Sequence, residues 1–178
     1  MKTFAQLGVD GSLVNALKKM GIAQPTAIQE QTIPPILAAK DVLGQSETGS
    51  GKTLAYLLPL IQKIDRQQKA TQVIILTPTH ELGIQIQRVI ETLVRESGWE
   101  ISSLPLIGNV NIARQIEKLK QKPQIIVGSS GRILELIQKK KIVAQTVRTI
   151  VLDEADRLLD EQNSSSVKAV IKTALSRT

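Results

Sequence analysis

Short apolar segments rich in β-branched residues alternate along this chain with longer segments of helical periodicity. Apolar runs without polar alternation are typical of strands that are buried on both faces of a sheet. The alternation therefore predicts an α/β fold with a parallel sheet, right-handed crossovers and helices on both faces. We expect strands at residues 42–43, 73–76, 101–107, 125–127 and 150–152, and helices near residues 10–20, 25–38, 52–67, 80–96, 110–120, 131–139 and 164–175.

The chain has 178 residues, which suits one domain with a substantial core. No repeat, low-complexity tract or Gly/Ser linker marks an internal boundary, so we expect a single domain over residues 1–178. The absence of cysteine excludes a disulfide framework and, with only one histidine, argues against a zinc site. No signal-peptide core or membrane-length apolar run is present, which favours a cytoplasmic location.

One of the predicted helices follows a glycine-rich segment, Ser46-Glu47-Thr48-Gly49-Ser50-Gly51-Lys52-Thr53. The backbone N–H groups of such a turn, together with the helix N-terminus, form a cradle for phosphate. Lys52 would reach the β- and γ-phosphates, and the Thr53 hydroxyl would bind Mg²⁺. Ser46 stands where glycine is usual and is accepted as another small residue. The alternative is an ordinary glycine turn at the start of a helix.

A second motif, Asp153-Glu154-Ala155-Asp156, follows the last predicted strand. Successive residues at a strand end project to different sides, so adjacent carboxylates can take different tasks. We expect Asp153 to bind Mg²⁺ directly or through water, and Glu154 to orient and deprotonate the attacking water. An acidic helix N-terminus is the alternative, but it would not account for a phosphate loop in the same chain. The two motifs together predict a site for a nucleoside triphosphate and its magnesium.

The motif-like segments follow the predicted strands, where ligands of parallel α/β sheets bind. They are residues 45–53, 77–81, 108–111, 128–132 and 153–156. The order and spacing of these motifs resemble the first RecA-like domain of the DEAD-box ATP-dependent RNA helicases, whose namesake is the Asp-Glu-Ala-Asp motif. The resemblance extends from Phe4 to slightly beyond Asp156 and implies a RecA-like fold with a P-loop.

A segment upstream of the phosphate loop resembles the family's Q motif: Gly21-Ile22-Ala23-Gln24-Pro25-Thr26-Ala27-Ile28-Gln29. Phe4, seventeen residues before Gly21, stands where the family has an isolated aromatic residue. The resemblance implies that Gln29 recognises adenine, whose N6 amino group and N7 match the amide, and that Phe4 stacks near the base. A hydrophobic anchor for Phe4 and a surface helix position for Gln29 are the alternatives.

Three more segments resemble the family's contacts to the RNA backbone, each with departures. They are Pro78-Thr79-His80-Glu81-Leu82-Gly83 in place of Pro-Thr-Arg-Glu-Leu-Ala, Gly108-Asn109 in place of a double glycine, and Ser129-Ser130-Gly131-Arg132 in place of Thr-Pro-Gly-Arg. The last offers helix N–H groups and a cation to phosphate, whereas His80 lacks the fixed charge of arginine. The alternative is turn and cap chemistry, for which Thr79 and Ser130 are good types. Arg114 and Gln115 would add contacts or lie on a solvated face.

Positive charge is concentrated in one part of the chain. Residues 114–148 hold nine Lys or Arg against two Glu, in a chain with a formal net charge of +7. Such an excess favours a polyanion as partner, with a solvated basic surface as the alternative. Aromatic residues are too few for a base-stacking platform, so we expect contacts to the RNA backbone with low sequence specificity.

The resemblance implies the N-terminal domain of an ATP-dependent RNA helicase, an ATP hydrolase that unwinds or remodels RNA when joined to a second RecA-like domain. That second domain is absent from this chain, so we expect a nearly inactive, monomeric fragment. Lys52, Asp153 and Glu154 would carry the chemistry, with ATP and Mg²⁺ as cofactors, and Asp156 would couple nucleotide state to the rest of the domain. The alternatives are a non-enzymatic nucleotide- and RNA-binding module and a DNA translocase of the same superfamily, against which Gln29 argues.

Overall fold

The computed structural model describes residues 1–176. Contacts within the chain divide it into two compact units. The first comprises Met1–Asp65 and Ile90–Glu100, and the second comprises Arg66–Val89 and Ile101–Thr178. Within residues 1–176, no helix is long and apolar enough to cross a membrane.

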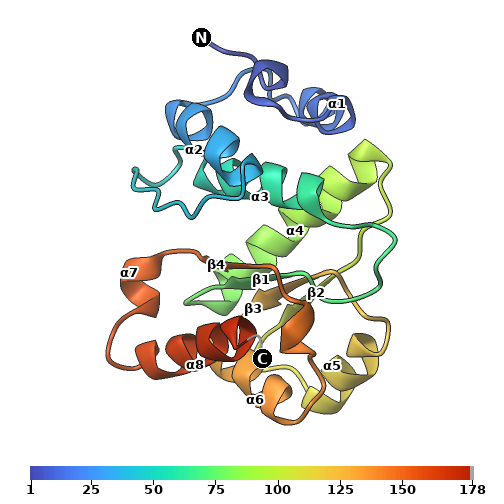
Figure 1. Cartoon of the computed structure of the whole chain (residues 1–178), viewed down its shortest axis with the longest axis vertical. Helices are drawn as coiled ribbons and strands as arrows, with labels where there is room; N and C mark the ends of the chain where they lie inside the picture. Colours follow the sequence, from blue (N-terminus) through green and yellow to red (C-terminus); the bar gives the residue numbers. More distant parts are fainter. Residues whose placement is uncertain (177–178) are drawn as a thin grey trace. The chain divides into compact units, whose positions relative to one another are not determined.

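The second unit is built on a sheet of four parallel strands in the order β2-β3-β1-β4 (Figure 1). The strands are β1 (Val73–Leu76), β2 (Ser103–Leu106), β3 (Ile125–Gly128) and β4 (Thr149–Leu152). All four residues of β1 and of β3 are buried, as their unbroken apolar sequences predict. The parallel α/β fold expected from the sequence is therefore confirmed.

Glycine is required at the end of β3. A β-carbon on Gly128 would lie 2.0 Å from the carbonyl oxygen of Leu106, its partner in β2. Because both atoms belong to the sheet backbone, neither can move without disturbing the pairing. Gly128 therefore allows β2 and β3 to stay paired up to the point where their loops begin.

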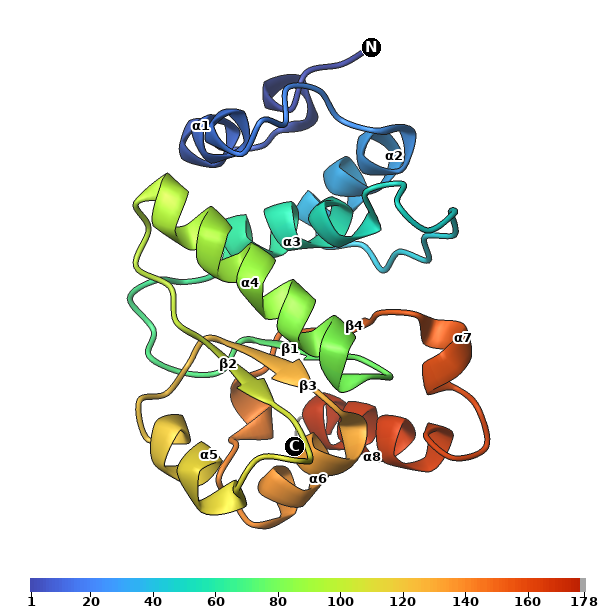
Figure 2. The same ribbon diagram turned by 180° about the vertical axis from the view of Figure 1, so that it is seen from behind.

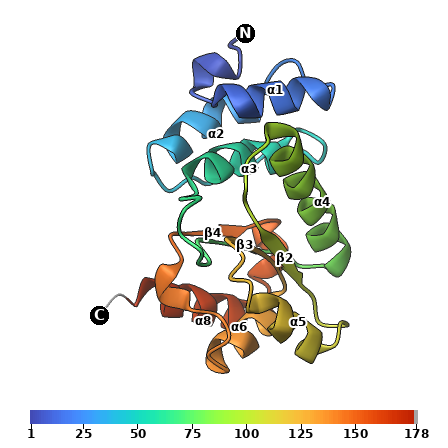
Figure 3. The same cartoon turned by 90° about the vertical axis from the view of Figure 1, so that its right-hand side faces the viewer.

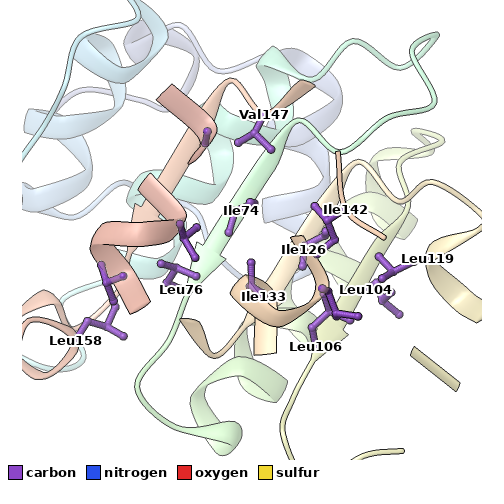
Figure 4. Close-up of a cluster of buried hydrophobic side chains, with 14 residues drawn as sticks. Ile74, Leu76, Leu104, Leu106, Leu119, Ile126, Ile133, Ile142, Val147 and Leu158 are labelled. Carbon is purple, nitrogen blue, oxygen red and sulfur yellow. The ribbon is translucent and has the colours of Figure 1, made fainter. Parts of the chain in front are cut away.

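One face of the sheet is covered by α5 (Ile112–Leu119), α6 (Ser130–Gln138) and α8 (Ser164–Leu175). Figure 4 shows the buried side chains that fill this layer. Alternate strand residues such as Ile74 and Leu76 meet Ile133 of α6 there. The cluster is entirely apolar, and its members are Ile74, Leu76, Leu104, Leu106, Leu119, Ile126, Ile133, Leu136, Ile142, Val147, Leu158, Val167, Val170 and Ala174.

The other face of the sheet is covered by the first half of α4 (His80–Ser97), as Figure 2 shows. Gly83 permits the close approach, because a β-carbon there would lie 3.2 Å from Thr77 Oγ1 and 4.0 Å from Val127 Cγ1. Ile86, one turn further along, is fully buried. Helices therefore cover both faces, as expected.

The first unit is helical, with a 3₁₀ turn η1 (Ala5–Leu7) and the helices α1 (Gly11–Lys19), α2 (Ala27–Leu37) and α3 (Lys52–Lys63). Asp10 caps α1 by accepting a hydrogen bond from the Ser12 N–H at 2.8 Å. Helices α2 and α3 pack against each other (Figure 3) and bury Ile33, Leu58 and Ile61. This packing brings the Q-motif-like segment beside the phosphate loop.

Two sequence predictions of local structure are wrong. Residues 42–43 form no strand but belong to an irregular loop between α2 and α3 (Figure 1), and Leu43 is 92% exposed. Two apolar residues between Asp41 and Gly44 are too few to define a buried strand. The predicted helix 52–67 ends at Lys63 because Ile64 adopts an extended backbone. The short elements η1 and η2 (Ala144–Thr146) were not expected, and α7 (Ala155–Leu158) was expected only as the alternative of an acidic helix N-terminus.

Candidate functional site

The glycine-rich segment forms a loop that folds around the ammonium group of Lys52. Lys52 Nζ donates to the carbonyl oxygens of Ser46 and Glu47, the latter at 2.9 Å. The hydroxyls of Ser46 and Ser50 lie 2.5 Å apart, closing the loop from the other side. Gly49 and Gly51 have φ of 83° and 90°, a left-handed backbone that favours glycine. The loop therefore folds around the side chain of Lys52, the first residue of α3.

Gln29 connects α2 to this loop. Its Oε1 accepts from the Thr26 N–H at 3.0 Å, in a capping box at the start of α2, and its Nε2 donates to the Gly51 carbonyl at 3.0 Å. Gln29 is only 2% exposed, so the alternative of a surface helix position is wrong. An amide has two donor hydrogens and two acceptor positions, so one of each remains beyond these bonds.

Phe4, the other residue expected to contact the base, is buried at the N-cap of η1. Its carbonyl accepts from the N–H groups of Leu7 and Val9 at 3.1 Å each. Next to it, the Lys2 N–H donates to Glu30 Oε1 of α2 at 3.1 Å, which ties the N-terminal segment to the Q-motif-like helix. The burial of Phe4 agrees with the alternative reading of this residue as a hydrophobic anchor. Base stacking by Phe4 stays a prediction.

The acidic motif turns sharply away from the end of β4. Asp153 is buried, and its N–H still bonds to the Leu76 carbonyl of β1 at 3.1 Å. Glu154 adopts a left-handed backbone with φ of 52°, and its exposed carboxylate lies 3.1 Å from Arg157 Nη1. Asp156 is exposed on α7. The two leading carboxylates thus occupy different environments, one enclosed and one open to solvent.

Two of the loops that resemble RNA contacts lie side by side in the second unit. His80 begins α4, and its Nε2 lies 3.5 Å from where a β-carbon on Gly108 would be. Thr79 caps α4 by accepting from the Leu82 N–H at 3.2 Å. The structure therefore places the start of α4 against the loop that follows β2.

Arg132 joins the third of these loops to the second. Its Nη1 donates to Gln115 Oε1 at 2.7 Å and to the Val110 carbonyl at 3.1 Å, and its Nη2 donates to the Gly108 carbonyl at 2.8 Å. Gln115 is 3% exposed and donates from Nε2 to the Ile107 carbonyl at 2.9 Å. Gln115 therefore does not lie on the solvated face that the sequence allowed. The sequence signal for the burial of Gln115 was its position, as a polar residue, on the apolar side of α5.

The serines of the third loop have separate tasks. Ser129 is the N-cap of α6, and its Oγ accepts from the Arg132 N–H at 3.4 Å. Ser130, which the sequence suggested as a cap, lies inside the helix, is buried and has its Oγ 2.6 Å from Ser166 Oγ of α8. Ser130 therefore links two helices, and Ser129 shapes the loop.

Comparison with known proteins gives consistent results. Residues 26–177 match the family model described as DEAD/DEAH box helicase. The chain is 48% identical over 163 residues to the DEAD-box ATP-dependent RNA helicase CshC of Bacillus cereus and 46% identical over 155 residues to the probable ATP-dependent RNA helicase YfmL of Bacillus subtilis. These matches cover 92% and 87% of the chain, respectively.

A solved structure has the same fold. The crystal structure of a DEAD box protein from the hyperthermophile Methanococcus jannaschii superimposes with a TM-score of 0.90 at 32% identity, over 96% of this chain and 46% of that one. The chain spans 41% of the length of each of the two Bacillus relatives. Because the family model covers most of the sequence and the fold agrees with a solved member, the chain belongs to the DEAD/DEAH box helicase family.

Proposed function

We propose that this chain is the ATP- and RNA-binding N-terminal domain of a DEAD-box RNA helicase, acting in the cytoplasm as a monomer. The observation that carries the proposal is the contact between Gln29 and Gly51, 3.0 Å from Nε2 to the carbonyl oxygen. It joins the segment suited to recognise a purine base to the segment suited to hold its phosphates. A phosphate loop alone would not require such a partner.

The nucleotide would be held by Ser46 to Thr53 and recognised by Gln29. The left-handed glycines suit a loop whose N–H groups would bind phosphate, and Lys52 would add a point charge for the β- and γ-phosphates. The amide positions that Gln29 keeps can accept from N6 of adenine and donate to N7. Guanine presents an acceptor at O6, so this pairing disfavours it. Phe4 would stack near the base.

Magnesium would be bound by Thr53 and Asp153. A hydroxyl and a carboxylate supply the hard oxygen ligands that Mg²⁺ prefers, together with phosphate oxygens. When bound, the ion neutralises charge on the β- and γ-phosphate oxygens. Glu154, whose carboxylate is accessible and held near Arg157, would orient and deprotonate the attacking water. Asp156 would couple nucleotide state to the rest of the domain.

The RNA backbone would lie along the loops that the second unit brings together. These loops include Pro78, Thr79 and His80, then Gly108 and Asn109, then Ser129, Ser130, Gly131 and Arg132. The basic excess in residues 114–148 supports a polyanionic partner. Positive charge that attracts phosphates also supports low sequence specificity, because phosphates carry no sequence information.

Catalysis by the whole protein would need a second RecA-like domain. Arginines brought to the transferring phosphoryl group are worth roughly 10³ to 10⁵ in rate in other phosphoryl-transfer enzymes. Joined to such a domain, this one would couple ATP hydrolysis to the unwinding or remodelling of RNA. The competing proposal is a non-enzymatic module that binds nucleotide and RNA.

Calorimetric titration with ADP and GDP tests the proposal. We expect ADP to bind more tightly, and Gln29→Ala to weaken ADP binding more than inorganic polyphosphate binding. Gln31→Ala, on the exposed side of the same helix, is the matched control and should leave both affinities unchanged. Equal affinity for ADP and GDP would contradict the adenine site and leave only a generic phosphate loop.

A further inference from the structure

The side chains of Arg132 and Gln115, which we call the clamp, hold the carbonyl groups of the loop after β2. Three carbonyls are bound: Ile107 by Gln115, and Gly108 and Val110 by Arg132, at 2.8 to 3.1 Å. The two clamp side chains bond to each other at 2.7 Å. Both belong to helices of the second unit, so the loop is fixed by the packed part of that unit.

The guanidinium of Arg132 is largely occupied by these contacts. Besides its three hydrogen bonds, its Nε lies 3.3 Å from Glu135 Oε2, and the side chain is only 13% exposed. Four of its five N–H groups are therefore directed at protein oxygens. Its charge is balanced by Glu135, which weakens any attraction it exerts on an external phosphate.

Binding the carbonyls fixes where the amide groups of the loop point. In a trans peptide unit the C=O and N–H are antiparallel, so an N–H points away from the group that binds its carbonyl. The N–H groups of Gly108, Asn109 and Asn111 share their peptide units with the three clamped carbonyls. They are therefore directed away from the clamp, and all three residues are exposed. A row of outward N–H groups suits phosphate oxygens.

We propose that Arg132 is a positioning residue: with Gln115 it presents the N–H groups of residues 108–111 to the RNA backbone and does not itself contact phosphate. This inference rests on the proposed function, because it assigns a role within RNA binding. Without the clamp, binding must order the loop. We expect the affinity to fall about tenfold, the scale of ordering one loop residue.

The test compares Arg132→Lys, Arg132→Gln and Gln115→Leu by fluorescence anisotropy with a single-stranded RNA over a salt series. Lysine keeps the charge but loses the planar fork, so all three variants should lose affinity about equally. The slope of log K against log salt should stay that of the unaltered chain, because no phosphate-bound cation is lost. The double variant Arg132→Gln, Gln115→Leu should be no weaker than the weaker single variant.

A second readout does not involve RNA. The ¹⁵N heteronuclear NOE of residues 108–111 should fall in each clamp variant and stay unchanged in Lys118→Gln, which removes an exposed charge from α5 without touching the clamp. Near-normal RNA affinity of Arg132→Lys, with a slope flattened by about 0.7 in Arg132→Gln, would overturn the proposal. Unchanged NOE values in the clamp variants would also overturn it. Failure of the unaltered chain to bind RNA would instead refute the proposed function, while the NOE values still report on the clamp.

Discussion

The side-chain nitrogen of Gln29 occupies the space that a β-carbon on Gly51 would need. Nε2 lies 3.0 Å from the Gly51 carbonyl oxygen and would lie 2.5 Å from such a carbon, and Thr26 Oγ1 would lie 3.1 Å from it. The start of α2 and the phosphate loop are therefore fitted to each other. A substitution in either segment should therefore disturb the structure of both.

Gly51→Ala is expected to disturb this fit. The left-handed backbone at Gly51 costs an alanine about 1–2 kcal/mol, and its methyl group would displace the Gln29 amide. We expect ADP affinity to fall at least about tenfold, which is about 1.4 kcal/mol. Calorimetric titration measures the affinity, and urea denaturation measures the loss of stability.

Gly11→Ala is the matched control for this substitution. Gly11 begins α1, its φ is not positive, and a β-carbon there would meet no atom within 4 Å. We expect a change in stability of less than about 1 kcal/mol, in the stabilising direction, and unchanged ADP binding. If Gly51→Ala behaved like Gly11→Ala, the contact between Gln29 and the loop would not matter for the nucleotide.

Glu154→Gln separates nucleotide binding from hydrolysis. The amide keeps the size of the side chain but cannot accept the proton of water. We expect ATP·Mg²⁺ affinity within about twofold of the unaltered chain and stability changed by less than about 1 kcal/mol, because the Arg157 pair is exposed. The unaltered chain should hydrolyse ATP barely above background, and the variant should lose this residual hydrolysis.

An assay of phosphate release with and without RNA checks this prediction. Strong RNA-stimulated turnover by these 178 residues would contradict the need for a second domain.

Gly128→Ala should destabilise the second unit. Its β-carbon would lie 2.0 Å from the Leu106 carbonyl oxygen, so β2 and β3 must separate at their ends. We expect a loss of about 3 kcal/mol in the free energy of unfolding. Gly131→Ala, where a β-carbon meets nothing within 4 Å, should be neutral or slightly stabilising. Equal midpoints in urea denaturation for the two variants would show that the strand ends tolerate separation.

RNA binding by this chain should be weak, tolerant of sequence and steeply dependent on salt. Each phosphate neutralised on a single strand contributes about −0.7 to the slope of log K against log salt, so a few contacts give a slope of a few units. Fluorescence anisotropy with two dissimilar oligonucleotides over a salt series measures both properties. A flat salt response, or a strong preference for one of the oligonucleotides, would point to base recognition in place of backbone contact.

Sequence pattern was sufficient where one local rule decided the outcome. The four strands of the sheet begin and end within two residues of their apolar runs. For β1 and β3 the reason is that every residue is buried, which leaves little room for polar residues. The strand predicted at residues 42–43 was wrong because two apolar residues are too few to indicate a buried strand. Likewise Thr79 could be recognised as a cap from its type, whereas the choice between Ser129 and Ser130 depended on where α6 begins.

The sequence by itself determined the parallel α/β fold and singled out the segments 46–53 and 153–156 as the proposed nucleotide site, because both inferences depend on local periodicity and on residue types at fixed spacing. Only the tertiary structure decided what Gln115, Ser130 and Arg132 contact, since each reaches residues on other elements, at distances along the chain from 8 to 36 residues. It also showed that the side chain of Gln29, 22 residues away, occupies the space that a β-carbon on Gly51 would need. Such contacts arise only when helices and loops pack, and although the helical pattern signals that Gln115 is buried, no local pattern identifies the partners of Gln115, Ser130 and Arg132.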